Sequence, residues 1–481
     1  MEQVCSYING KLHCNNGEDL IEVFNPSSGE KLVEFMDASD DDVDYAVSSA
    51  LVASKSWAAT PAIERATYLT EIAREIRKRK EDIAKIITKE QGKVYGLSLV
   101  EVEFTANYMD YMAEWARRIE GEVIESDKRG ESIFLLRKPI GVAAGIVAWN
   151  FPFFLLARKM APALVAGNTI VLKSSEETPL NAMAFVQAVE AAKLPDGVFN
   201  LVSGKGNTAG ARLSENPNVG IISFTGSVET GKAIMKAASQ NLTKVNLELG
   251  GKAPAIVLKD ANLDLAAKAI FDSRVINSGQ VCNCAERVYV ERPVAEEFLE
   301  KLKNLMANVK IGDPSGDEQV EMGPLINKQA VVKASAMLQR ALGEGATLYY
   351  GGETLEQIGP CFFQPTILTD CHENMEIMQN EIFAPILPVQ IVDSLKEAVD
   401  LANSGRYGLT SSIYTENFAS AMQACKELEF GETYVNRENF EAMQGFHAGR
   451  KQSGIGGADG KHGLYEYMDT HVIYLNHGEL K

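Results

Sequence analysis

The sequence predicts an α/β protein built on parallel sheets, and three observations support this fold class. First, strand, turn and helix alternate from about residue 140 onward, a pattern that specifies a parallel sheet covered by helices on both faces. Second, the chain is 46% hydrophobic and 23% charged, which is typical of a folded globular protein. Third, a chain of 481 residues is too long for one ordinary hydrophobic core, so two or three domains are expected. No linker-like segment separates the halves of the chain, so these domains are expected to be interleaved.

Two helices are predicted before the alternating region. Residues 40–57 carry an apolar stripe made of Val43, Ala46, Val47, Ala50 and Leu51. Thr60 and Pro61 mark the start of the next helix, because proline is favoured in a first helical turn. Five basic residues crowd into 74–80, and we interpret them as the solvated face of an amphipathic helix.

The alternating region is predicted in detail up to about residue 258. Strands are expected at 141–149, 169–173, 199–202 and 221–224. Two helices are expected between these strands, at 155–165 and 181–192. A third is expected to run through Leu213, and a fourth to begin at Gly226 and Ser227. Strands at 245–248 and 254–258 begin another set that continues to about residue 450, which predicts a second α/β domain. In such sheets ligands bind beyond the carboxyl ends of the strands.

Charge and cysteine usage exclude several classes of protein. The net charge of -18 repels nucleic acid and anionic lipid. Seven scattered cysteines favour reduced thiols in the cytoplasm over a disulfide framework, and the N-terminus has no export signal. Residues 140–157 are apolar, but they include Asn150, Pro152 and two glycines, so a buried strand and loop is favoured over a membrane span.

Cys282 and Glu248 are the candidate catalytic residues, and each has an ordinary alternative. A lone cysteine is mostly a small buried hydrophobe, and Glu248 could be a carboxylate exposed beyond its strand. The Leu-Glu-Leu-Gly-Gly setting at 247–251 would also suit a general base of raised pKa. Cys282 and Cys284 lack zinc-knuckle spacing and have no histidine near them in sequence, so no metal site is predicted.

Five segments occur in an order and at spacings that resemble the aldehyde dehydrogenase superfamily. They are Asn-Phe-Pro at 150–152, Phe-Thr-Gly-Ser at 224–227, Leu-Glu-Leu-Gly-Gly-Lys at 247–252, Gly-Gln-Val-Cys at 279–282 and Asn-Glu-Ile-Phe-Ala-Pro at 380–385. The resemblance runs from about residue 20 to the C-terminus. Across 276–287 and 436–463 the chain looks most like the bacterial lactaldehyde (glycolaldehyde) dehydrogenases.

The resemblance implies a thioester mechanism. Cys282, as a thiolate, would attack the aldehyde carbon. The side-chain amide of Asn150 and the backbone N–H of Cys282 would hold the resulting oxyanion. After hydride transfer to the nicotinamide, Glu248 would activate the water that hydrolyses the thioester.

The resemblance also implies NAD as the cofactor. Lys173 and Glu176 would hold the adenosine ribose, where the carboxylate would repel the extra phosphate of NADP; a plain surface pair at a helix start is the alternative. The other implied cofactor contacts are Trp149, Gly226, Ser227, Leu249, Glu381 and Phe383. Ser174 and Ala384 depart from the family's usual Pro and Gly, and Ala384 could alter the approach to the nicotinamide half.

Four polar residues are expected around the substrate entrance: Arg158, Asn283, Glu441 and His447. Arg158 could recognise a hydroxyl or a carboxylate, or could simply form an ion pair on its helix face. Such a polar mouth suits a short hydroxyaldehyde, so lactaldehyde and glycolaldehyde are predicted as substrates. Succinate semialdehyde is the alternative substrate.

The resemblance divides the chain into three parts. The NAD-binding domain would comprise residues 1–119 and 140–248, and the catalytic domain 249–449. Residues 120–139 and 450–481 would form an oligomerisation arm and C-terminal segment. Residues 471–475 have strand composition but few local partners, so pairing with another subunit of a homotetramer is expected.

Two other classes of function stay open at this point. A cysteine esterase or thioesterase would use the same nucleophile, but no histidine partner is evident near it, and the cofactor motifs are complete. A binding protein that had lost turnover would not need intact Cys282, Glu248 and Asn150.

Overall fold

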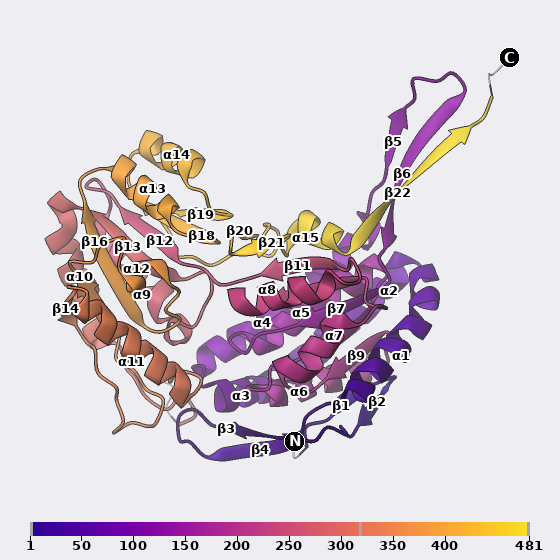
Figure 1. The fold of residues 1–481 in the computed structure, drawn as a ribbon, viewed down its shortest axis with the longest axis horizontal. Coiled ribbons are helices and arrows are strands. Elements are labelled where there is room, and N and C mark those ends of the chain that lie inside the picture. The colour runs from indigo at the N-terminus through magenta and orange to yellow at the C-terminus, as the bar shows by residue number, and fades with distance from the viewer. Residues whose placement is uncertain (1–2, 317–319, 479–481) are drawn as a thin grey trace.

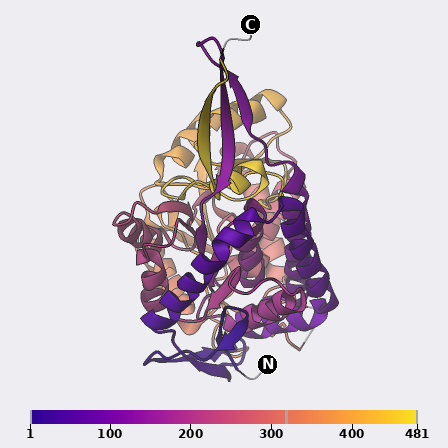
Figure 2. The same cartoon turned by 90° about the vertical axis from the view of Figure 1, so that its right-hand side faces the viewer.

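The computed structural model describes residues 3–316 and 320–478. Figure 1 shows two lobes, each with its own sheet, and an arm of three strands that projects from the lobe formed by the N-terminal half. Figure 2, turned by 90°, shows the arm at the opposite end of the molecule from the N-terminus.

The first sheet has eight strands in the order β2-β1-β9-β8-β7-β10-β11-β21. Strands β9, β8, β7, β10 and β11 run parallel, while β1, β2 and β21 pair antiparallel at the margins. The strands are β1 (Ser6–Ile8), β2 (Lys11–His13), β7 (Val142–Ile146), β8 (Thr169–Lys173), β9 (Phe199–Val202), β10 (Ile221–Thr225), β11 (Lys244–Glu248) and β21 (Gly454–Ile455). Burial of β7 to β10 along their whole length fits a sheet with both faces covered.

Helices cover this sheet on both faces, as Figure 1 shows. They are α1 (Asp40–Ala59), α2 (Ala62–Lys78), α3 (Lys80–Gln91), α4 (Tyr95–Glu114), η1 (Trp115–Arg117), α5 (Pro152–Ala166), α6 (Pro179–Ala191), η2 (Gly206–Gly210), α7 (Ala211–Glu215) and α8 (Val228–Ala238). Ser39 closes a capping box at the start of α1. The basic run at 74–80 is divided between α2 and α3, which meet at Arg79.

The second sheet has seven strands in the order β14-β15-β16-β13-β12-β18-β19, all parallel except β14. The strands are β12 (Ala253–Val257), β13 (Ala285–Glu291), β14 (Thr347–Tyr350), β15 (Thr366–Thr369), β16 (Ile386–Val392), β18 (Thr410–Tyr414) and β19 (Glu432–Val435). Its helices are α9 (Leu263–Val275), η3 (Ile276–Gly279), η4 (Arg292–Val294), α10 (Ala295–Asn308), α11 (Lys328–Gly343), α12 (Glu376–Gln379), α13 (Leu395–Ser404) and α14 (Phe418–Glu427). The predicted α/β class with parallel sheets is therefore confirmed.

The arm is a separate sheet in the order β22-β6-β5. β22 (Met468–Asn476) pairs with β6 (Glu131–Pro139) over nine residues, and β6 also pairs with β5 (Glu122–Glu125). The C-terminal strand was predicted to have few local partners and to pair with another subunit, and within the described chain one of its two edges pairs with β6. Its partner β6 lies more than 300 residues away in sequence, so local sequence could not reveal it.

The remaining elements are short. They are β3 (Leu20–Phe24) with β4 (Lys31–Met36), β17 (Tyr407–Gly408) with β20 (Arg450–Lys451), and α15 (Gly460–Glu466). Within the described residues, no helix combines the length and the apolar character needed to cross a membrane.

Candidate active site

The loops that follow β7 and β10 meet at the carboxyl edge of the first sheet. β7 and β10 are neighbours, and the chain order runs outward in opposite directions from this pair, so a crevice opens between the two loops. The loop after β7 carries Trp149 and Asn150, and the loop after β10 carries Gly226 and Ser227. Ser227 caps α8, with its hydroxyl accepting from the backbone N–H of Thr230.

A cleft of about 470 Å³ runs along this edge and ends at Cys282. Its lining includes five predicted cofactor residues besides Gly226: Trp149, Ser227, Leu249, Glu381 and Phe383. The rings of Trp149 and Phe383 lie edge to face with centroids 5.6 Å apart. Phe383 has a φ of 56°, an uncommon value for an aromatic residue, so the 380–385 segment is held in a constrained conformation.

The 380–385 segment is fixed from behind by Glu286. Its carboxylate accepts from the backbone N–H groups of Ile382 and Phe383 and is paired with Lys252 at 2.8 Å. Glu381 accepts from the backbone N–H of Gly251 at 2.8 Å, and burial raises the pKa of Glu381 to about 7. The methyl group of Ala384 is buried in the second core and does not enter the cleft.

Lys173 is the last residue of β8, and Glu176 follows it at the same sheet edge. Lys173 Nζ is 2.6 Å from Glu176, whose other oxygen accepts from the backbone N–H of Gly206 at 3.0 Å. Burial acts to raise the pKa of Glu176, but Lys173 outweighs it and the pKa is lowered. Beside them the hydroxyl of Ser174 is buried and has no hydrogen-bond partner.

This donor set fits a nicotinamide dinucleotide. Carboxylates that can accept from ribose hydroxyls stand at Glu176 and Glu381, and Ser227 at the N-terminus of α8 lines the same cleft as Glu381. A side chain at Gly250 would collide with Glu381, so the backbone there stays bare toward the cleft.

The loop preceding Cys282 has a strained backbone. Asn277, Ser278 and Gly279 all have positive φ, at 47°, 58° and 75°, and for the two non-glycine residues such values cost about 1–3 kcal/mol each. The segment is pinned by hydrogen bonds from Asn277 Nδ2 to the carbonyl of Asn150 and from Ser278 Oγ to the carbonyl of Gly323. The strain is thus held by the surrounding structure, which fixes the position of Cys282.

Asn150 reaches the same loop from the other side. Its Nδ2 donates to the carbonyl of Gln280 at 3.1 Å, which uses one of its two N–H groups. Asn150 also lines both cavities that meet at Cys282. The second N–H is therefore available to a group bound beside the thiol.

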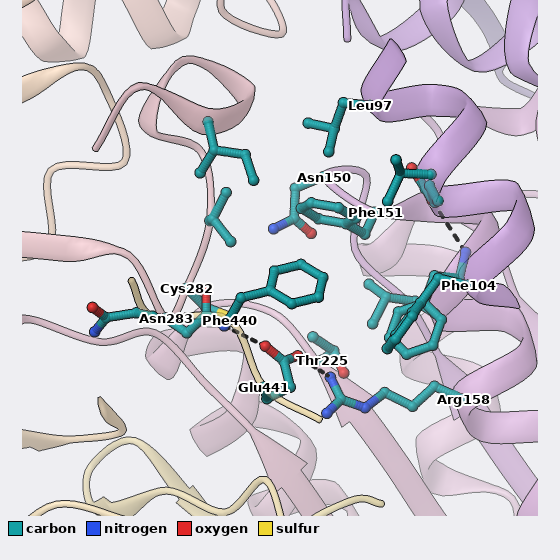
Figure 3. A pocket seen from close by; sticks show the side chains of 17 residues that line it. Leu97, Phe104, Asn150, Phe151, Arg158, Thr225, Cys282, Asn283, Phe440 and Glu441 are labelled. Carbon is teal, nitrogen blue, oxygen red and sulfur yellow. Dashed lines mark hydrogen bonds and ion pairs between the residues drawn. The ribbon is translucent and has the colours of Figure 1, made fainter. Parts of the chain in front are cut away.

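A second, smaller pocket of about 60 Å³ also has Cys282 in its lining (Figure 3). Its wall is largely apolar, which the sequence did not predict; the large apolar side chains are Leu97, Phe104, Phe151, Phe154, Leu155 and Phe440. Its polar residues include Arg158, Asn283 and Glu441, as predicted. Figure 3 shows Glu441 between the other two, and it accepts from Asn283 and lies 3.5 Å from Arg158.

Glu248 lies in the cofactor cleft as a buried ion-pair partner. It is 2.7 Å from Lys159 and 3.7 Å from Arg158, and only 3% of its side chain is exposed. Burial acts to raise the pKa of Glu248, but Lys159 and Arg158 outweigh it and bring the pKa to about 2. The expectation of a raised pKa is therefore wrong, because two cations that follow each other on α5 face this carboxylate.

Arg158 is itself an ion-pair partner. Its Nε and Nη2 bind Asp459, with Nε at 3.1 Å from Oδ1, and both side chains are almost fully buried. The ion-pair alternative considered for Arg158 is thus present in the structure, and only Nη1 faces Glu441 and Glu248.

His447 lies away from the pocket wall. Its Nδ1 is 2.8 Å from Glu432, its side chain is 2% exposed, and it does not line the small pocket. Burial and Arg158 act to lower the pKa of His447, but Glu432 and a hydrogen bond with Cys282 raise it well above 6.5. Because Cys282 is among the groups that influence the pKa of His447, the lack of a histidine near Cys282 in sequence does not by itself argue against a cysteine hydrolase.

Cys284 differs from Cys282 in its surroundings. Its thiol is buried, donates to the carbonyl of Val281, and burial raises its pKa to about 12. Cys282 is partly exposed where the two cavities meet. In the part of the chain that the structure describes, no cluster of His, Cys, Asp or Glu is arranged to hold a metal ion.

Lys159, Asp459 and Glu432 were not identified from sequence. Lys159 could have been identified from sequence, because Arg158 and Lys159 are adjacent basic residues inside the apolar stretch 152–166, and buried cations need partners. Asp459 could not be identified in this way, since it contacts Arg158 across 301 positions of chain, and Glu432 contacts His447, 15 positions away, only after folding.

Comparison with known proteins places the chain among enzymes of one kind. A family model described as the aldehyde dehydrogenase family matches residues 13–473. Lactaldehyde dehydrogenase of Escherichia coli strain K12 is 54% identical over 469 residues, which are 98% of each chain. A crystal structure of lactaldehyde dehydrogenase from Escherichia coli matches with a TM-score of 0.97 and 53% identity, over 98% of this chain and 99% of that one.

Two other relatives differ in their substrates and cofactors. The NADP(+)-linked succinate-semialdehyde dehydrogenase of Escherichia coli strain K12 is 36% identical over 469 residues, 97% of each chain. A crystal structure of betaine aldehyde dehydrogenase from Staphylococcus aureus with NAD+ matches with a TM-score of 0.96 and 31% identity, over 100% of this chain and 96% of that one.

Proposed function

Because this chain belongs to the aldehyde dehydrogenase family, we propose that it uses NAD to oxidise a short hydroxyaldehyde, lactaldehyde to lactate or glycolaldehyde to glycolate. The predicted family is thereby confirmed, and the chain is an oxidoreductase that acts on aldehydes with a nicotinamide dinucleotide. The observation that carries the choice of substrate is the small pocket at Cys282, where Arg158 and Glu441 offer a donor and an acceptor side by side.

We propose that Cys282 is the nucleophile. Its Sγ, as thiolate, forms a bond to the aldehyde carbon, and the carbonyl electrons move to oxygen, giving a thiohemiacetal anion. The free N–H of Asn150 and the backbone N–H of Cys282 stabilise that oxyanion, where one such donor contributes about 3 kcal/mol. The bound dinucleotide supplies the hydride acceptor, and oxidation leaves a thioester on Cys282.

Glu248 is proposed as the base that releases the acid. It lines the cofactor cleft with Cys282, and its low pKa keeps it ionised at neutral pH. To take a proton from water at the thioester, the carboxylate must leave Lys159, which is 2.7 Å away in this structure. Water then adds to the thioester carbon, the C–S bond breaks, and Cys282 is restored.

The proposed substrate binding uses Arg158 and Glu441 together. A 2-hydroxyl group can accept from Arg158 Nη1 and donate to Glu441, while the aromatic wall excludes water. Succinate semialdehyde is the second candidate, because an arginine faces the pocket. Its carboxylate would meet Glu441 and Glu248 beside that arginine, and like charges a few ångströms apart cost about 1–4 kcal/mol.

NAD is proposed over NADP on the basis of Glu176. Its lowered pKa keeps this carboxylate charged, so it accepts from ribose hydroxyls and repels a 2′-phosphate. Lys173 is already paired with Glu176 and is not free to bind the phosphate.

A cytoplasmic homotetramer is proposed for the assembly. The arm exposes apolar side chains, including Val123 and Tyr474, and leaves one edge of β22 unpaired within the described chain. All seven cysteines are free, which suits a reducing compartment. Light scattering on the purified protein measures its molar mass, and the mass of a monomer would contradict the proposed homotetramer.

The substrate is tested by steady-state kinetics with NAD. Catalytic efficiency is measured for lactaldehyde, glycolaldehyde, succinate semialdehyde and propionaldehyde on wild type and Arg158→Ala. We expect the hydroxyaldehydes to be preferred, and Arg158→Ala to harm them more than propionaldehyde. Preference for the semialdehyde, or an equal loss on propionaldehyde, would contradict hydroxyl recognition.

A further inference from the structure

Asp459 is a buried acid on the far side of Arg158 from the pocket. It precedes α15 with a φ of 71° and a ψ of 162°, a backbone region that is essentially restricted to glycine. Its side chain is 2% exposed. The chain thus holds a carboxylate in the interior at a position of unfavourable backbone geometry, which calls for a compensating role.

The carboxylate of Asp459 occupies the fork of Arg158. Nε donates to Oδ1 at 3.1 Å and Nη2 donates to Oδ2, a two-point geometry that fixes the plane of the guanidinium. Only Nη1 is left toward the substrate side, 3.5 Å from Glu441 and 3.7 Å from Glu248. Asp459 therefore decides both where Arg158 points and how much of its charge remains uncompensated.

The local charges add up to an excess of acid. Arg158 and Lys159 are the cations, and Glu248, Asp459 and Glu441 are the acids that face them. The neighbouring His447 and Glu432 form a pair of their own and leave this excess unchanged. A pocket floor with excess negative charge disfavours an anionic substrate, although it contains an arginine.

We propose that Asp459 is a positioning residue that determines specificity, by neutralising Arg158 so that the pocket accepts neutral hydroxyaldehydes and rejects aldehydes that carry a carboxylate. The proposal rests on the small pocket being the substrate site, as in the proposed function. Without the Asp459 charge, the two cations and the two remaining acids would balance, and the fork of Arg158 would be left to pair with a substrate carboxylate.

The test compares Asp459→Asn with wild type on three aldehydes with NAD. Asparagine has the size and shape of aspartate and meets the same backbone strain, so the change is mainly one of charge. We expect the kcat/KM for succinate semialdehyde, divided by the kcat/KM for glycolaldehyde, to rise at least tenfold. Most of this rise should come from a lower KM for the semialdehyde. Propionaldehyde has neither a hydroxyl nor a carboxylate, so its kcat/KM measures any damage to the catalytic step itself. That value should change by a smaller factor than the ratio does.

Asp42→Asn is the matched control. Asp42 is also a 2% exposed aspartate near a helix start, paired with His13 at 2.8 Å, and it lies in α1 away from the pocket. Its substitution should leave the substrate ratio unchanged. Should Asp459→Asn not fold, Asp459→Gly removes the same charge at a positive φ and should shift the ratio in the same direction.

The outcome is judged relative to wild type, whichever substrate wild type prefers. If wild type prefers the semialdehyde, the proposed substrate fails, yet a rise in the ratio on Asp459→Asn still supports the role of Asp459. An unchanged ratio in a folded variant, or equal losses of kcat/KM on all three aldehydes, would overturn the proposed role of Asp459.

Discussion

Replacing Lys159 with methionine should raise the pKa of Glu248 and move the acid limb of turnover to higher pH. Lys159 is the largest of the influences that lower the pKa of Glu248, which burial alone would raise. The fall from 4.5 to about 2 corresponds to about 3 kcal/mol, at about 1.4 kcal/mol per pH unit. Once Lys159 is removed, burial is opposed mainly by Arg158 and His447, so we expect a pKa above the ordinary 4.5.

The same ion pair links turnover to stability. Because the folded-state pKa of Glu248 is depressed, its contribution is present above about pH 4.5 and is lost as the pH falls toward 2. Burial lowers the pKa of Lys159, so removal of this lysine also relieves a desolvation cost. The net loss of stability at neutral pH should therefore be smaller than about 3 kcal/mol.

The assay is the pH dependence of steady-state kcat at saturating NAD and aldehyde, after the initial burst of NADH. Wild type should show no acid limb from Glu248 in the range where it is folded, and Lys159→Met should lose turnover below about pH 5. Lys252→Met is the control, since Lys252 forms a buried pair of the same kind with Glu286. Superimposable profiles of Lys159→Met and wild type would refute the proposed tuning of Glu248.

Three further predictions follow from the site. Cys282→Ala should abolish oxidation while NAD still binds, measured by fluorescence titration, whereas Cys284→Ala should keep substantial activity; the reverse result would reassign the nucleophile. Glu176→Gln should narrow the preference for NAD over NADP, because it removes the repulsion between the Glu176 carboxylate and the 2′-phosphate of NADP. A wild type with a higher kcat/KM for NADP than for NAD would overturn the proposed role of Glu176. In NMR titrations the imidazole of His447 should titrate above its ordinary pKa of 6.5, because Glu432 raises that pKa. Glu432→Gln should lower the midpoint of the His447 titration, and an unchanged midpoint would argue against the pair.

Much of the first sheet could be predicted because its strands are locally distinctive. The predicted strands at 169–173 and 199–202 match β8 and β9. The predicted strand at 141–149 was too long, because β7 ends at Ile146 and the next residues form the loop that carries Trp149 and Asn150. We propose the domain division given by the resemblance, although β21 extends the first sheet from a segment assigned to the C-terminal part.

The chemistry of the site was less predictable than its residues. Motifs led to Cys282 and Glu248, but the pKa of Glu248 depends on Lys159, which faces it only after folding. The ion pair of Arg158 with Asp459 joins residues 301 positions apart. Sequence patterns record local periodicity, whereas these pairings arise from tertiary packing.

The most direct test of the proposed mechanism is to trap the acyl-enzyme. Glu248→Gln protein is mixed with NAD and lactaldehyde, quenched in acid, digested and examined by mass spectrometry, with the NADH burst recorded in parallel. We expect one NADH per active site, slow turnover afterwards, and the mass of one lactoyl group on the peptide at Cys282. Rapid steady turnover, an unmodified Cys282 after the burst, or the lactoyl group on Cys284 would contradict oxidation through a Cys282 thioester.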